Sequence, residues 1–99
     1  MNNRETHQDY QYVTAQIGER YRLIECCNNF QWILQKKDKT SDRWRGRSFF
    51  LDKQSMIRVF ETHGFNTALI DHLPDRFESQ YKTVQGARGP SNKVLLIIS

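Results

Sequence analysis

Three strand-like segments, two of them with side chains that alternate in character, constrain the fold of this chain more than any other feature. They are YRLIECC at 21–27, FQWILQKK at 30–37 and RWRGRSFF at 43–50. Side chains along a strand point alternately to the two faces of a sheet, so each segment is predicted to be a strand with one buried face. Asn28 and Asn29 suit a tight hairpin, and the residues of 38–42 are polar. Because sequential strands joined by short loops usually pair, we expect a three-stranded antiparallel sheet.

Helices are predicted after the third strand. Asp52 is placed to cap the segment KQSMIRVFETH, which carries its apolar residues at helical spacing, and Gly64 is a natural stop. A second, shorter helix begins at the N-cap Asn66 and ends before Pro74. The predicted fold class is therefore α+β: a three-stranded antiparallel sheet packed against one long and one short helix.

One face of the predicted sheet supplies the core. The side chains that share this face, together with two from the first helix, are Phe30, Trp32, Leu34, Trp44, Phe50, Met56 and Phe60. Phe77 and Tyr81 follow at a spacing of four, which allows one further helical turn in the ambiguous stretch 75–85. The expected domain spans residues 20–85.

The two ends of the chain are expected to lie outside this domain. Residues 1–19 are polar and are predicted to form a partly ordered arm, and GARGPSN at 86–92 has linker composition. Residues 93–99 contain VLLII, which favours either an edge strand or a loose tail. As an edge strand, this segment would pair either with the sheet of the same chain or with a second copy, which would form a dimer.

Positive charge is concentrated in the middle of the sequence. The net charge is +4, yet residues 20–58 alone hold ten basic and four acidic side chains. Arg43, Arg45 and Arg47 alternate along the third strand and are expected to share the face opposite Trp44 and Phe50. Such a face suits phosphates, with amide side chains reaching bases. The candidate nucleic-acid-binding residues are Arg20, Arg22, Gln31, Gln35, Lys36, Arg43, Arg45 and Arg47. The alternative is an ordinary solvated sheet face.

Other kinds of site find little support in the sequence. Cys26 and Cys27 are adjacent, and His63 and His72 are nine residues apart, which matches no zinc spacing. We expect reduced thiols, no metal, no cofactor and no enzymatic activity, because no catalytic motif accompanies the acidic and histidine side chains. No apolar run approaches the length of a membrane span, so the expected protein is cytoplasmic, without a membrane partner.

The run YRLIECCNNFQWILQKK followed by RWRGRSFF resembles small bacterial, phage and mobile-element proteins in which a W-I-L-Q strand precedes a W-x-x-R-S-F segment. The order of three strands and a helix is also similar to AP2-type and integrase amino-terminal DNA-binding domains. The first resemblance implies no activity, and the second implies DNA binding through the sheet. Two functions are therefore expected as alternatives: a nucleic-acid-binding accessory protein, or an inhibitor or adaptor that binds an acidic surface on another protein.

Overall fold

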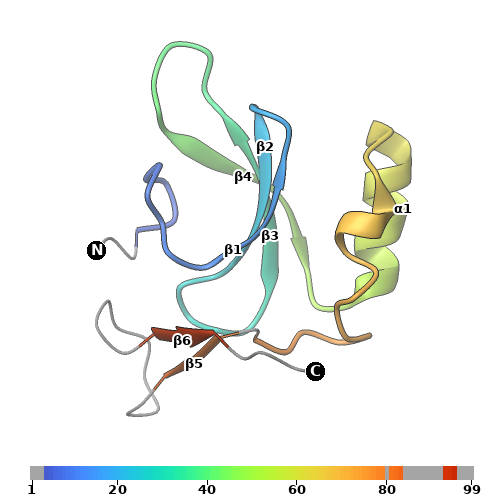
Figure 1. Ribbon diagram of the computed structural model, residues 1–99. Coiled ribbons are helices and arrows are strands. Elements are labelled where there is room, and N and C mark those ends of the chain that lie inside the picture. Colours follow the sequence, from blue (N-terminus) through green and yellow to red (C-terminus); the bar gives the residue numbers. More distant parts are fainter. Residues whose placement is uncertain (1–3, 80, 84–92, 96–99) are drawn as a thin grey trace.

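Four antiparallel strands and one α-helix form the main body of the protein (Figure 1). The computed structural model describes residues 4–79, 81–83 and 93–95. The sheet has the order β1-β2-β3-β4, so β1 and β4 are its edges. The elements are β1 (Val13–Ile17), β2 (Tyr21–Glu25), β3 (Trp32–Lys37), β4 (Trp44–Phe50), α1 (Lys53–His63), a 3₁₀ turn (Thr67–Leu69), β5 (Tyr81–Thr83) and β6 (Lys93–Leu95).

The α+β architecture agrees with the sequence prediction, but two of its details were wrong. The sheet has a fourth strand, β1, in the segment predicted to be a partly ordered arm. The second helix is only a single 3₁₀ turn at Thr67–Leu69. The predicted N-cap is present there, since the Asn66 side chain accepts a hydrogen bond from the Ala68 amide at 3.0 Å. An α-helical hydrogen bond joins residues four apart, so a three-residue segment is too short for it and forms the tighter 3₁₀ turn.

The ends of α1 form as the sequence predicts. Asp52 accepts a hydrogen bond from the Ser55 amide at 2.8 Å, which satisfies one of the unpaired donors of the first turn. Gly64 adopts a left-handed conformation, with φ of 77°, and closes the last turn. Met56 and Phe60 are the buried residues of the helix and lie one turn apart on the face toward the sheet. The cap chemistry and one apolar stripe therefore define this helix.

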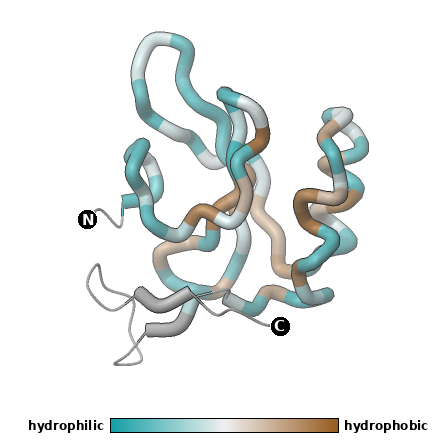
Figure 2. The backbone as a smooth tube through the Cα atoms, in the orientation of Figure 1, coloured by the Kyte–Doolittle hydropathy of each residue, from teal (hydrophilic) through white to brown (hydrophobic). Residues whose placement is uncertain are grey.

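The first core lies between α1 and one face of the sheet, here called the helix face. Pairing across the strands places Leu23 opposite Leu34, and Trp32 opposite Phe50, on this face. The buried members are Ile17, Leu23, Trp32, Leu34, Phe50, Met56, Phe60, Ile70 and Leu73. Phe30 was expected here but is 52% exposed, because it precedes β3 in the hairpin turn. Figure 2 shows the brown apolar stretches gathered on the strands and on α1.

A second core covers the opposite face of the sheet, here called the arm face. Its buried members are Tyr10, Tyr12, Ile24, Cys26 and Ile33. Residues 4–12 run across this face before β1 begins (Figure 1). The Tyr10 hydroxyl donates to the Glu25 carbonyl at 2.7 Å, and the Glu25 amide donates to the Tyr12 carbonyl at 2.9 Å. The N-terminal segment is therefore part of the fold, because two tyrosine rings bury against the sheet.

A β-bulge in β4 changes which side chains share a face. Leu34 pairs with Ser48 and Gln35 pairs with Gly46, so Arg47 is an extra residue in β4. Beyond the bulge Trp44 pairs with Lys37 on the arm face, whereas Phe50 lies on the helix face. Trp44 is buried as expected, at 1% exposure, but it packs on the face opposite to the one predicted.

The C-terminal part of the chain also differs from the prediction. Phe77 packs edge-on against Trp32 in the first core, and Tyr81 packs against Tyr12 of the second. Since these two rings meet opposite sides of the sheet, they do not share one helical turn as predicted. Strand β6 pairs with β5 and not with an edge of the four-stranded sheet. The predicted linker at 86–92 and the last four residues of the predicted tail lie outside the described residues.

Candidate functional site

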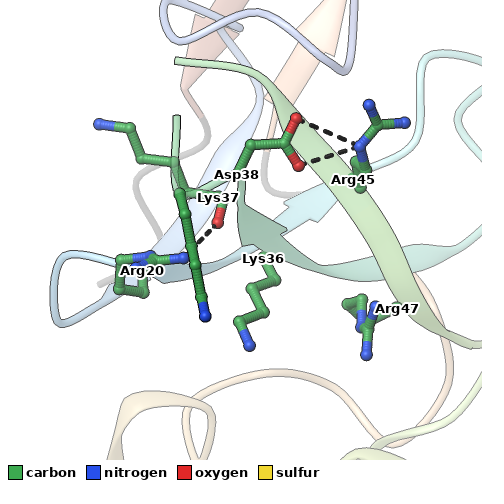
Figure 3. Close-up of a pocket in the computed structure, with 7 residues that line it drawn as sticks. Arg20, Lys36, Lys37, Asp38, Arg45 and Arg47 are labelled. Carbon is green, nitrogen blue, oxygen red and sulfur yellow. Dashed lines mark hydrogen bonds and ion pairs between the residues drawn. The ribbon is translucent and has the colours of Figure 1, made fainter. Parts of the chain in front are cut away.

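Six cationic side chains line one hollow of about 160 Å³ at the end of the sheet that carries the β1–β2 turn. The hollow contains a single carboxylate, that of Asp38. We call the six the basic cluster; they are Arg20, Lys36, Lys37, Lys39, Arg45 and Arg47. They come from the residue before β2, from the end of β3 and the loop after it, and from β4. Figure 3 labels all the lining residues except Lys39.

Two members of the basic cluster, Lys36 and Arg45, continue the helix face of the sheet past the apolar core, whereas Lys37 pairs with Trp44 on the arm face. Tyr21 pairs with Lys36, and Lys36 pairs with Arg45, so the three lie in one row across β2, β3 and β4. Residues directly opposite each other on neighbouring strands share a face. The adjacent row holds Leu23 and Leu34 in the core. The face therefore changes from apolar to cationic within one row of side chains.

The bulge in β4 is what aligns the arginines with this row. Without it, Arg45 and Arg47 would point away from Phe50, as the sequence pattern predicts. The extra residue moves Arg45 to the same face as Ser48 and Phe50. In Figure 3 the Lys36 and Arg47 side chains extend in the same direction. Arg45 therefore lies on the helix face, next to the apolar core, and not on the arm face.

Few of these positive charges are neutralised within the described part of the chain. The Asp38 carboxylate accepts two hydrogen bonds from Nε of Arg45, at 2.9 and 3.2 Å, and these bonds lower the pKa of Asp38. Lys37 lies 3.4 Å from the exposed Asp42 carboxylate. Arg47 and Lys39 are exposed, and neither side chain forms a hydrogen bond or ion pair there. The cluster retains donors that an anion can use.

The backbone fixes the position of Arg20 within the cluster. Its Nη2 donates to the Lys37 carbonyl at 2.9 Å, and its own carbonyl accepts from the Lys37 amide at 2.7 Å. These two contacts tie the start of β2 to the end of β3. One wall of the hollow is therefore held in place before any ligand binds, which reduces the entropy lost on binding.

Arg22 and Gln35 were predicted to lie on the exposed basic face, and the structure corrects both. Each is 1% exposed, because residues 4–12 cover the arm face on which they lie. Nε of Arg22 donates to Oε1 of Gln35 at 2.7 Å, and the Arg22 guanidinium carbon lies 4.4 Å from the centroid of the Trp44 ring. The remaining guanidinium nitrogens donate to the carbonyls of Glu5, His7 and Gln8.

These contacts give Arg22 a role in holding the fold together, because its side chain is buried and not available to a ligand. Burial lowers the pKa of Arg22 to about 10, which still leaves the guanidinium charged at neutral pH. The Gln35 amide also donates to the Glu5 carbonyl, at 2.8 Å. Neither side chain can reach a ligand in the basic cluster, because both are buried under residues 4–12 and already hydrogen-bonded there.

Two further residues predicted for the site, Gln31 and Arg43, lie apart from the basic cluster. The sequence prediction also left out two residues that belong to it. Gln31 precedes β3 at the other end of the strand and is half-buried. Arg43 is exposed but lines a separate hollow with residues 6–9. Lys37 and Lys39 belong to the cluster although they were not predicted. The run of cations around Asp38 in 36–39 was the available signal for them.

No group of three or more histidine, cysteine, aspartate or glutamate side chains lies together among the described residues. Cys26 is a buried free thiol and Cys27 an exposed one. Within residues 4–79, 81–83 and 93–95, no helix is both long and apolar enough to cross a membrane.

Comparison of the chain with protein-family models, with curated proteins and with solved structures finds no match. The resemblance drawn from the W-I-L-Q and W-x-x-R-S-F segments therefore stays a prediction.

Proposed function

We propose that this protein is a non-enzymatic nucleic-acid-binding module that holds phosphates in the basic cluster. The observation that supports the proposal most is the ratio of six cationic side chains to one carboxylate in a single hollow. Like charges held this close repel one another and raise the free energy of the folded protein. A polyanionic ligand relieves that repulsion and releases its own counterions when it binds.

The composition of the cluster favours nucleic acid over an acidic protein surface. Protein interfaces place aromatic and apolar side chains at their centre and are depleted in lysine. Three of the six cations here are lysines. The large exposed apolar side chains of the described residues, Phe30, Phe49 and Leu51, are not among those that line the hollow. Phe49 pairs with Ile33 and so lies on the arm face.

The kind of recognition follows from the available groups. Lysine and arginine contacts to phosphates position a nucleic acid but carry no sequence information. The two glutamines expected to contact bases, Gln31 and Gln35, are remote or buried. We therefore expect binding that depends strongly on salt and weakly on sequence.

Fluorescence anisotropy with labelled single-stranded and duplex oligonucleotides tests the proposal over a range of salt concentrations. The variant Arg45→Gln/Arg47→Gln removes two charges from the cluster. Its matched control, Arg58→Gln/Arg76→Gln, removes two exposed arginines that line a different hollow. If both cluster arginines contact phosphates, the slope of log affinity against log salt falls by about two for the first variant and stays unchanged for the control.

Three results count against the proposal. The first is that the wild-type protein binds no nucleic acid at low salt. The second is an equal loss of affinity in both variants, which would show a diffuse charge effect. The third is binding to an acidic polypeptide such as polyglutamate without binding to nucleic acid, which would favour the alternative function of modulating another protein.

A further inference from the structure

Three aromatic rings lie in contact beside the basic cluster, where the C-terminal end of α1 meets the start of β2, and two of them are stacked. The His63 and Phe65 rings are stacked, with centroids 4.9 Å apart and an interplanar angle of 9°. Tyr21 contacts both, with centroid distances of 4.9 Å to Phe65 and 5.7 Å to His63. We call His63, Phe65 and Tyr21 the ring stack. Phe65 also packs edge-on against the buried Phe60, which anchors the stack to the first core.

The ring stack and the basic cluster are adjacent and meet at Lys36 and Tyr21. Lys36 belongs to the cluster, and its ammonium lies 5.6 Å from the centroid of the Tyr21 ring. Tyr21 and Lys36 are also direct partners across β2 and β3. A ligand that places a phosphate near Lys36 therefore also lies next to Tyr21, one of the three rings.

The outer ring of the stack is suited to contact a ligand. Phe65 and Tyr21 are half-buried, whereas His63 is exposed. Because the His63 ring lies nearly parallel to Phe65, its second face is turned away from Phe65. Imidazole, like the other aromatic rings, provides a surface on which an unpaired base stacks.

We propose that the site takes a single-stranded nucleic acid, with a base stacked on His63 and the adjoining phosphates in the basic cluster; this inference rests on the proposed function. A duplex presents only its backbone at such a surface, because its bases are already stacked on each other. A single strand offers both groups within one or two nucleotides, and stacking is tolerant of base identity. This matches a cluster that can position phosphates without reading a sequence.

The test compares three ligands of the same length: oligodeoxythymidine, its abasic analogue with the same phosphates, and a duplex. Stacking of a base predicts that the wild-type protein binds oligodeoxythymidine about 5- to 150-fold more tightly than the abasic analogue. His63→Ala removes this preference, and His63→Phe keeps it. His72→Ala is the matched control, since His72 is exposed and lies outside the ring stack. The ring protons of His63 shift in NMR spectra with the thymidine ligand and not with the abasic one.

The outcomes separate this inference from the function on which it rests. If none of the three ligands binds, both are wrong. Equal affinity for the thymidine and abasic ligands overturns the stacking inference and leaves phosphate binding in place. Tighter binding to the duplex overturns it in the same way. A thymidine preference that survives His63→Ala shows that bases are held elsewhere, which also overturns the inference.

Discussion

The buried Arg22 offers a sharp test of how the arm face is held together. Arg22→Met keeps an unbranched side chain of similar reach but removes every donor and the positive charge. Four hydrogen bonds disappear: one to Oε1 of Gln35 at 2.7 Å, and three to arm carbonyls between 2.8 and 3.1 Å. The stacking of the guanidinium on the Trp44 ring is lost as well.

The size of the effect follows from which groups lose their partner. A hydrogen bond to a charged group contributes about 1.5 to 3 kcal/mol, but the four do not simply add, because the arm carbonyls regain water once the arm moves. Oε1 of Gln35 is the exception, because this atom belongs to the sheet and stays buried under residues 4–12. Removing one partner of a buried charged network costs about 3 to 5 kcal/mol, and we expect the lower end, about 3 kcal/mol. In a domain of this size that corresponds to a melting temperature about 12 to 24 °C lower.

Urea denaturation followed by tryptophan fluorescence measures this loss, and hydrogen exchange of residues 5–12 shows whether the arm is released. Arg58→Met is the control, because Arg58 is exposed on α1 and its side chain is far less costly to change. We expect the control to remain within about 0.5 kcal/mol of the wild-type protein. An Arg22→Met variant within about 1 kcal/mol of the wild type, with normal protection of the arm, would refute the reasoning.

Two further predictions concern carboxylates. Asp38→Asn removes the single carboxylate of the hollow, so oligonucleotide affinity at low salt should rise about fivefold; an anisotropy titration showing unchanged or weaker binding would contradict this. The hydrogen bond from the Ser55 amide lowers the pKa of Asp52 in the folded protein, so the wild-type protein loses this stabilisation as the pH falls below the ordinary value of 3.8. Asp52→Asn keeps the cap without a titrating group, so its melting temperature should fall less steeply in acid, and parallel melting curves for the two proteins would argue against the prediction.

The elements that local chemistry determines were predictable. Asp52 and Gly64 define the ends of α1 through hydrogen bonds and a left-handed residue that depend only on near neighbours. Asn29 adopts a positive φ of 61° in the turn between β2 and β3, as its residue type suggests. These signals need no knowledge of the rest of the chain.

The second layer of the fold was not predictable from alternation alone. Arginine and glutamine are usually exposed, so Arg22 and Gln35 marked the arm face as solvated. Ile24 and Ile33 on the same face were the contrary signal, because apolar residues on both faces indicate a sheet covered on both sides. Tyr10 and Tyr12 supply that cover from a segment that looks polar overall.

The face of the sheet on which the candidate site lies depends on a one-residue shift in the pairing of β3 with β4. The alternation of RWRGRSFF places Arg45 and Phe50 on opposite faces, and the bulge at Arg47 brings them to the same face. Gly46 was a hint, since a glycine inside a strand often marks a bulge. The composition of the segment therefore predicted a basic surface, and only the pairing of β3 with β4 shows which surface it is.

The most direct test of the central proposal is an NMR titration of the ¹⁵N-labelled protein with a short oligonucleotide, which reports where the ligand binds. We predict that the largest shifts occur in the basic cluster, at Arg20, 36–39 and 45–47, and include the side-chain Nε groups of Arg45 and Arg47. Arg22, buried on the opposite face, should remain unchanged. Shifts centred on Phe30, Phe49 and Leu51, or spread evenly over the exposed arginines of the whole chain, would contradict the proposal that the basic cluster is the binding site.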